Sequence, residues 1–225
     1  NEGSAEEPVE ILAYHFEKGE DPHRAMHYLE KMGDQCATAH RCAAALRAYE
    51  GARDISRELT GTKQVRKLTL SLLLKIGKMA MREEQHDAAG SSFKDALRLS
   101  QELSDVCQRG WAHKELGNLY HLRGDFTRAS NSLDEALHCA EQSKDDRLLF
   151  EVLEAQGNLQ VSRGSGDEAE KILARALEMA RKLEEPEATA RAMNDLAVFF
   201  DREGRHEEAE DYLLKAADIT ATYSL

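Results

Sequence analysis

Apolar residues recur with the period of a helix along almost the whole chain, and the pattern itself repeats every forty residues. Its clearest copy runs from Trp111 to Leu137, where small and bulky apolar residues three, four and seven positions apart mark one face of each helix. Similar residues stand forty positions before this copy, and forty and eighty positions after it. Four copies in one register indicate an internal repeat. The recurring positions of the central copy are Leu116, Gly117, Tyr120, Gly124, Ala129, Leu133 and Ala136.

Each copy predicts two helices joined by a turn. The first helix keeps glycine at one position in three copies, as Gly77, Gly117 and Gly157. A glycine inside a helix costs about 1 kcal/mol relative to alanine, so this recurrence predicts that the second helix approaches the backbone there. The predicted helices cover residues 66–84, 87–103, 106–123, 126–143, 146–163, 167–184, 187–203 and 206–222.

The turns between paired helices are expected at residues 123–125, 163–167 and 203–205, and each contains glycine. Glycine suits the left-handed residue that commonly ends a helix. Asp125 or Asp167 is placed to cap the helix that follows.

The repeated residues resemble the tetratricopeptide repeat, whose motif places Leu-Gly and then Tyr in the first helix, and Ala, Leu or Phe, and Ala in the second. The resemblance covers the chain well from about Arg66 to the end, and the first sixty residues more loosely. It implies an all-α fold, a right-handed superhelical solenoid of antiparallel helix pairs. The forty-residue period exceeds the usual 34, and it resembles the extended repeats of kinesin light chain, Leu-Gly-Asn polarity adaptors and bacterial regulatory solenoids.

We expect one continuous solenoid with two regions. Residues 61–225 hold the four regular units, and residues 1–60 form irregular helical hairpins of the same type. From Pro8 the chain predicts a helical pair with its turn between Gly19 and Pro22, and Pro22 suits the first turn of a helix. A compressed unit follows, in which Gly33 precedes a shortened first helix. The second helix of that unit is marked by Ala45, Tyr49 and Ala52.

The acidic balance limits the classes of partner. The chain has 42 Asp and Glu against 30 Lys and Arg, a net charge of −12. We expect no nucleic-acid surface, because phosphate binding needs clustered basic residues. No apolar run approaches the roughly 20 residues of a membrane span, and no signal-like start is present. These features predict a cytoplasmic protein without membrane contact, and the missing initial Met suggests a piece of a longer protein.

No residue constellation predicts catalysis, a cofactor or a metal. The chain lacks the zinc-protease, phosphate-loop and nucleophile-turn motifs. His23 and His27 stand four apart on one helix face, but no further ligand is placed by spacing to complete a metal site. Four cysteines show no paired spacing, so we expect buried thiols in a reducing compartment. These cysteines are Cys36, Cys42, Cys107 and Cys139.

A second stripe of residues lies beside the packing face of each first helix. In the tetratricopeptide family the first helices line the inner wall, so the resemblance implies that this stripe faces a concave groove. Asparagine is a poor helix former, yet its carboxamide can pair with both the N–H and the C=O of an extended peptide. Hydrogen bonding between repeats, without a ligand, is the alternative. The expected groove residues are Lys78, Trp111, Lys114, Asn118, His121, Asn158, Arg191 and Asn194.

Two of these residues have further interpretations. Trp111 either anchors a ligand side chain or covers the seam between two units. Lys114 with Asn118 resembles part of the clamp by which some tetratricopeptide domains hold a C-terminal carboxylate, although the other members of that clamp are missing.

These observations favour a non-enzymatic module that binds a protein segment in its groove. A second hypothesis makes the chain the sensor or autoinhibitory arm of a larger signalling ATPase, kinase, cyclase or transcription regulator. It rests on the N-terminal residues, which resemble the tetratricopeptide arm of bacterial signal-transduction ATPases. A peptide-pheromone receptor of the bacterial quorum-sensing kind shares the period, but the helix-turn-helix or phosphatase bundle that such receptors carry is missing. Apolar residues near the end also predict possible self-association through the last helix, at Leu213, Leu214 and Ile219.

Overall fold

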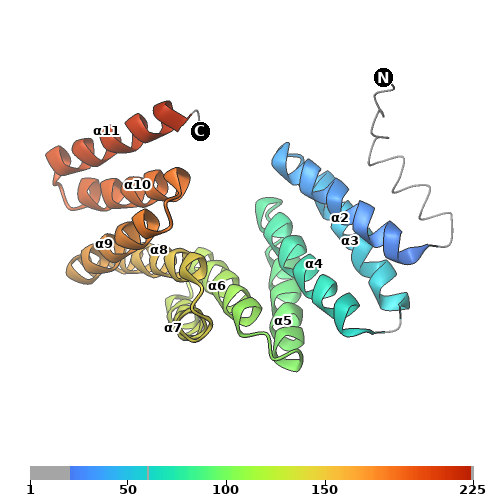
Figure 1. Ribbon diagram of the computed structural model, residues 1–225. Helices are drawn as coiled ribbons and strands as arrows, with labels where there is room; N and C mark the ends of the chain where they lie inside the picture. The colour runs from blue at the N-terminus through green and yellow to red at the C-terminus, as the bar shows by residue number, and fades with distance from the viewer. Residues whose placement is uncertain (1–20, 60, 224–225) are drawn as a thin grey trace, which may run out of the picture. The chain divides into compact units, whose positions relative to one another are not determined.

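The computed structural model describes residues 21–59 and 61–223, and within these ranges the chain forms ten helices and no strand (Figure 1). The expectations for Pro8 to Gly19, for Thr60 and for the last two residues lie outside the described residues. The all-α class and the helix-pair repeat are confirmed. The helices are α2 (Pro22–Thr38), α3 (Cys42–Glu58), α4 (Lys63–Arg82), α5 (His86–Glu102), α6 (Val106–Leu122), α7 (Phe126–Ser143), α8 (Asp146–Arg163), α9 (Gly166–Lys182), α10 (Pro186–Arg202) and α11 (His206–Tyr223).

The chain divides into two compact units, residues 1–108 and residues 109–225, here called unit 1 and unit 2. The even-numbered helices are the first helices of the repeat and the odd-numbered helices are the second helices. In unit 1, α2 packs against α3, α3 against α4, and α4 against α5. In unit 2, α7 packs against α8, α8 against α9, α9 against α10, and α10 against α11. The expected division at residues 60 and 61 stays a prediction.

The glycines of the first helices lie where the second helices come closest, as predicted. A Cβ atom added to Gly77 would lie 2.2 Å from the ring of Phe93, and one added to Gly157 would lie 2.4 Å from Leu173. The same contact joins Gly117 to Leu133, at 2.7 Å. Because real Cβ atoms do not come so close to other atoms, each of these positions excludes any side chain while its partner keeps its place.

The predicted arrangement around Gly33 is wrong. Residues 33 and 34 lie inside the 17-residue helix α2, not in a turn, and α3 is its full-length partner. A Cβ atom on Gly33 would lie 2.4 Å from the ring of Tyr49, which is the contact that Gly77 makes with Phe93. The helix pair is therefore a complete unit, not a compressed one, and it begins at Pro22, which occupies the first turn of α2 as expected.

Left-handed residues divide the described chain at regular intervals. The turn between the two helices of each repeat contains one such residue: His40, Glu84, Gly124, Gly164 or Gly204. The turn between successive repeats contains one as well, at Ser104, Lys144 and Glu184. The interval from His40 to Glu84 is 44 residues, whereas the later intervals between such turns are 40 residues. The four additional residues lie between α3 and α4 or in α4, which is 20 residues long.

Aspartates cap several of these helices. Asp125 accepts a hydrogen bond from the backbone N–H of Arg128 at 3.1 Å, which confirms it as the cap of α7. The prediction for Asp167 is wrong, because α9 begins at Gly166 and Ser165 precedes it. Asp167 lies in the first turn instead, where its negative charge favours the positive end of the helix dipole.

The last helix differs from the other second helices. Leu213 of α11 has the repeat position that Tyr49, Phe93, Leu133 and Leu173 have in the other second helices. Those four side chains are at most 2% exposed, whereas Leu213 is 50% exposed. The first helix of this last repeat, α10, carries Ala197 in place of the glycine. The methyl group of Ala197 takes the space that the bulky side chain of the second helix fills in the other repeats, and this accounts for the outward position of Leu213. Among the described residues, no helix is long and apolar enough to cross a membrane.

Candidate functional site

The predicted groove residues lie on first helices of both units. Lys78 belongs to α4 of unit 1 and is exposed. The other seven lie on α6, α8 and α10 of unit 2, and we call the surface they form the first-helix face. Lys114 is buried, at 8% exposed, whereas Asn194 is exposed. The remaining five are half-buried: Trp111, Asn118, His121, Asn158 and Arg191.

A network of ion pairs ties the three first helices of unit 2 together. The Nζ atom of Lys114 on α6 lies 3.0 Å from Oε2 of Glu151 on α8 and 3.4 Å from Oε1 of Glu115. Arg191 on α10 donates to the other oxygen of Glu151 at 2.7 Å and to Glu154 at 2.5 Å. The carboxylate of Glu151 thus joins a lysine from one side and an arginine from the other.

The two glutamates of α8 have opposite electrostatics. Burial favours the neutral form of Glu151, but the charges of Lys114 and Arg191 outweigh it and lower the pKa of Glu151 to about 2. Burial raises the pKa of Glu154 to about 7, because Arg191 only partly offsets it and the nearby charge of Asp195 adds to it. Glu151 is therefore ionised at neutral pH, and Glu154 titrates near neutrality.

Asp195 shares the environment of Glu154. Burial raises its pKa, and the nearby side chains of Asn158, Glu154 and Arg191 partly offset this. Its Oδ2 atom is buried and has no hydrogen-bond partner. Asn158 on α8 thus lies close to a carboxylate of α10.

Trp111 and His121 also make contacts within unit 2. The indole of Trp111 packs against a buried cluster that includes Ala136, Ala140 and Leu148, and Lys114 Nζ lies 5.7 Å from its ring centre. Trp111 therefore covers the seam between α7 and α8. His121 Nε2 lies 2.8 Å from Ser162 Oγ on α8, and burial lowers the pKa of His121.

Unit 1 has a smaller network on its first helices. Lys75 on α4 donates to Glu30 at 2.8 Å and to Asp34 at 2.8 Å, both on α2. The hydroxyl of Tyr49 donates to Asp34 at 2.7 Å, and burial together with this bond raises the pKa of Tyr49. The network therefore joins both first helices to the second helix α3.

Sequence reasoning missed Glu115 and Asp195 in unit 2. In unit 1 it missed Lys75 with its partners Glu30 and Asp34. The spacing of Arg191 and Asp195, four residues apart on one helix, was a usable signal. In unit 1 the signal was hidden, because the helix that begins at Pro22 was predicted as the second helix of a pair, which kept Glu30 off a first helix.

The side chains of these networks are charged groups and hydrogen-bond donors or acceptors. The four cysteines are free; Cys36 and Cys139 are buried and the other two half-buried. Within residues 21–59 and 61–223, no three His, Cys, Asp or Glu side chains are grouped to hold a metal ion. His23 and His27 instead line a hollow of about 440 Å³ together with apolar residues of α2 and α4.

Known structures share this fold. BtubC (BKLC) from P. vanneervenii is 20% identical, with a TM-score of 0.73 over 96% of this chain and 87% of that one. A Rap protein complexed with Competence and Sporulation Factor gives a TM-score of 0.82 at 14% identity, over 96% of this chain. The Rap conjugation gene regulator of plasmid pLS20, in complex with a Phr peptide, gives 0.79 at 16% identity, over 100% of this chain. This chain spans 59% and 60% of the two Rap chains.

A comparison with curated protein sequences finds no relative. The model of the tetratricopeptide repeat matches residues 68–142 and 149–221, about two thirds of the sequence. With the repeated glycine contacts and the paired helices, this match shows that the chain belongs to the tetratricopeptide repeat family.

Proposed function

We propose that the chain is a non-enzymatic protein-interaction module that holds an extended segment of another protein on the first-helix face of unit 2. The observation that carries the proposal is that polar side chains from three successive first helices lie on one surface. Ion pairs within that surface fix their positions, so a ligand meets groups that are already ordered.

The face offers two kinds of contact. Asn194 is exposed and Val198, one turn later on α10, is 51% exposed. An amide beside an apolar side chain suits a peptide, because the amide can pair with its backbone and the apolar group with a side chain. Asn118 and Trp111 are half-buried on α6, so a segment that crosses from α10 to α6 would meet donors, acceptors and an aromatic ring.

The fold comparison supports the kind of ligand. Two of the similar solved structures are Rap proteins in complex with a peptide or a peptide factor. Their identity to this chain is at most 16%, so we infer the ligand class and not the ligand. A short protein segment is the class that fits both the comparison and the amides of the first-helix face.

Selection of peptides from a random phage-displayed library on the immobilised chain would test this proposal. We expect a family of binders whose affinity, measured by isothermal titration calorimetry, falls about thirtyfold or more in a double variant Asn118→Ala, Asn194→Ala, because each of the two amides gives at least one hydrogen bond of about 1 kcal/mol. The matched control is Asn131→Ala, which removes an exposed asparagine from the second helix α7.

The selection can also contradict the proposal. Binders that keep their affinity in the double variant and in Trp111→Ala would place the ligand elsewhere on the molecule. A library that gives no binder at all would leave the first-helix face without a ligand of this class.

The regulatory-arm hypothesis stays a second prediction. It differs in requiring an effector domain whose activity changes when the first-helix face is occupied. A coding sequence without a neighbouring effector domain would end it, and the peptide-binding proposal would be unaffected.

A further inference from the structure

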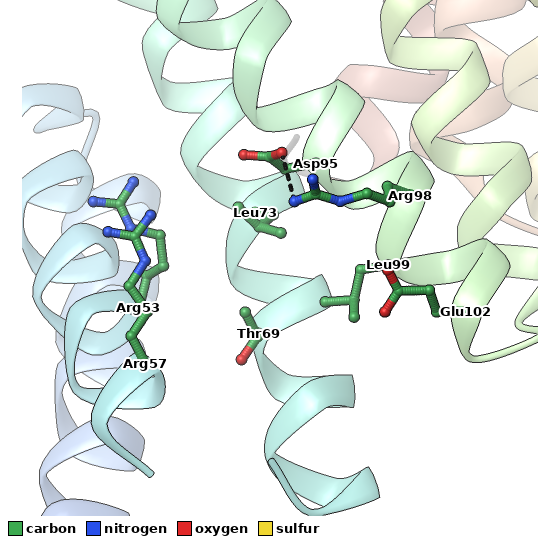
Figure 2. A pocket seen from close by; sticks show the side chains of 8 residues that line it. All are labelled: Arg53, Arg57, Thr69, Leu73, Asp95, Arg98, Leu99 and Glu102. Carbon is green, nitrogen blue, oxygen red and sulfur yellow. Dashed lines mark hydrogen bonds and ion pairs between the residues drawn. The ribbon is translucent and has the colours of Figure 1, made fainter. Parts of the chain in front are cut away.

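A charged hollow lies in unit 1 and shares no residue with the first-helix face. It has a volume of about 290 Å³ and is lined by residues of α3, α4 and α5 (Figure 2). Arg53 and Arg57 extend from α3 on one side, and Arg98 of α5 lies on the other side. Thr69 and Leu73 of α4 lie between them. The lining is completed by Asp95, Leu99 and Glu102.

The repeat explains why this hollow is open. Counted eight positions on from the buried repeat alanine of each second helix (Ala45, Ala89, Ala129 and Ala169), the residue is Arg53 in α3 but Leu97, Leu137 and Leu177 in the next three. Leu137 packs into the apolar cluster at the seam of α7 and α8, and Leu177 is 5% exposed. Leucine thus fills the seam in unit 2, whereas the arginine leaves a space with a guanidinium at its edge.

The arginines of the hollow exceed its carboxylates. Arg53 donates to Asp54 Oδ1 through Nε at 3.1 Å and through Nη2 at 2.9 Å. Arg57 uses the same oxygen at 3.3 Å, so one carboxylate serves two cations. Arg98 pairs with Asp95 at 3.1 Å. Glu102 pairs with Arg66 outside the lining.

We propose that this hollow is a binding site for an acidic side chain, an aspartate or a glutamate of a protein partner. Four arginines against three carboxylates leave an excess of one positive charge, in a chain whose net charge is −12. One carboxylate balances that excess. Arg57 and Arg98 are 66% and 72% exposed, so their donors are accessible from outside.

The floor of the hollow favours a carboxylate on a carbon chain over an inorganic anion. Leu73 and Leu99 give apolar surface on which methylene groups can pack. A phosphate dianion would overshoot the excess charge by one, and it would face Asp95 and Glu102 at close range. Guanidinium groups bind carboxylates through two parallel hydrogen bonds, which gives the contact a defined geometry.

Fluorescence anisotropy with a labelled peptide, acetyl-Leu-Glu-Glu-Leu-Glu-Glu-Leu-amide, tests the site on the full chain. We expect binding at about 50 mM salt that weakens with added salt, and no binding of the matched peptide with glutamine in place of glutamate. The variant Arg53→Leu, which restores the leucine of the other repeats, should weaken binding about tenfold or more. Arg47→Leu on the same helix, outside the hollow, should change it less than twofold.

Several results would overturn the site. Equal binding by the glutamine peptide, or unchanged binding in Arg53→Leu, would show that the arginines do not hold the ligand. Inorganic phosphate that displaces the peptide better than acetate at equal ionic strength would assign the hollow to phosphate. If circular dichroism shows that Arg53→Leu is unfolded, Arg57→Gln replaces it, since Arg57 is largely exposed and its loss leaves the core intact.

Discussion

Two seams contain the same positions of the repeat: the seam between α3, α4 and α5 in unit 1 and the seam between α7, α8 and α9 in unit 2. The side chains at these positions, and therefore the packing, differ. In unit 2 the seam is filled by Leu137, Leu149 and Met179. In unit 1 the corresponding positions are Arg53, Thr69 and Leu99, and they line a hollow. The comparison shows that a repeat keeps its fold through the glycine and alanine positions, which leaves the seam free to vary.

The charges of the two units differ in the same sense. The described residues of unit 1 have 14 Lys and Arg against 12 Asp and Glu, whereas unit 2 has 15 against 24. Unit 1 is therefore close to neutral and locally basic at the hollow. Unit 2 is strongly acidic, and four of its acids lie beside Lys114 and Arg191: Glu115 and Glu151, which are buried, and Glu154 and Asp195, which are half-buried. Opposite partners, an acidic side chain and a neutral or basic segment, suit the two units.

The largest expected effect is on the free energy of unfolding, and it differs between variants of the two lysines at the centre of these networks. Lys114 has a side chain only 10% exposed and Lys75 has one 30% exposed. Lys114→Met removes the cation that lies between the buried carboxylates of Glu115 and Glu151, and we expect it to lower the free energy of unfolding by about 3 kcal/mol. Lys75→Met should cost about 1 kcal/mol, because solvent reaches its partners.

Urea unfolding measures both effects, followed by far-UV circular dichroism and by the fluorescence of Trp111, the single tryptophan, in unit 2. Equal losses for the two variants would contradict the difference in burial.

The glycine contacts give the second prediction. Gly77→Ala places a methyl group 2.2 Å from the ring of Phe93, and we expect a loss of about 2 kcal/mol after the gain in helix propensity. Gly51→Ala is the matched control in unit 1, because its Cβ would meet Leu29 at an ordinary 3.5 Å. That variant should gain up to about 1 kcal/mol. Thermal unfolding decides it, and a shift of the same sign in both variants would contradict the close approach.

The third prediction concerns pH and unit 2. The pKa of Glu154 is raised to about 7 from 4.5, so the folded chain holds a proton that the unfolded chain releases above about pH 4.5. Stability from this group is complete below pH 4.5 and is lost as the pH rises through 7. Between pH 5 and 7.5 we expect the wild type to lose about 2 kcal/mol more stability than Glu154→Gln does.

Glu151 gives the opposite dependence on the same helix. Its pKa is lowered to about 2, so its contribution is present above pH 4.5 and is lost as the pH falls toward 2. Urea titrations followed by Trp111 fluorescence at several pH values measure both. Parallel curves for the wild type and Glu154→Gln from pH 5 to 7.5 would mean that Glu154 is ionised throughout.

The smallest effect concerns the seams themselves. Arg53→Leu should raise the free energy of unfolding by about 1 kcal/mol, because buried methyl groups outweigh a weak surface ion pair. The reciprocal variant Leu137→Arg in unit 2 should lower it by a similar amount or more. Chemical denaturation of the two variants shows whether arginine and leucine are exchangeable between seams, and a stability loss in Arg53→Leu would show that the hollow is better packed than its volume indicates.

The sequence alone predicts most of this fold. The eight helices predicted from residue 66 onward agree with α4 to α11 within three residues at each end, because glycine, alanine and turn residues mark both faces of every helix. The assignment failed at α2, where Gly33 followed by Asp34 has the composition of a turn. Only the tertiary contact with Tyr49 reveals that this glycine has the packing role of Gly77.

The proposed binding surfaces are harder to predict than the helices. Helix periodicity placed Lys114, Asn158 and Arg191 on one face, but it could not show that Lys114 is buried or that Asn158 lies close to Asp195. Those facts depend on side-chain directions in neighbouring repeats. The arginine hollow was open to prediction in principle, since Ala45, Tyr49 and Ala52 align α3 with the later second helices and Arg53 then stands in place of a leucine of the repeat.

The outward position of Leu213 has a consequence for motion. Helix α11 packs Tyr212 and Ile219 against the core but fully buries only Ala209 and Ala216, fewer residues than any other described helix, so we expect it to separate from its neighbour more readily than the inner helices do. Among the described helices of unit 2, its amides should exchange with deuterium first, before those of α8 and α9. Such peeling would bare the stacked rings of Phe200 and Tyr212, and a protease that cleaves after aromatic residues would then find its site there while the rest of unit 2 stayed intact.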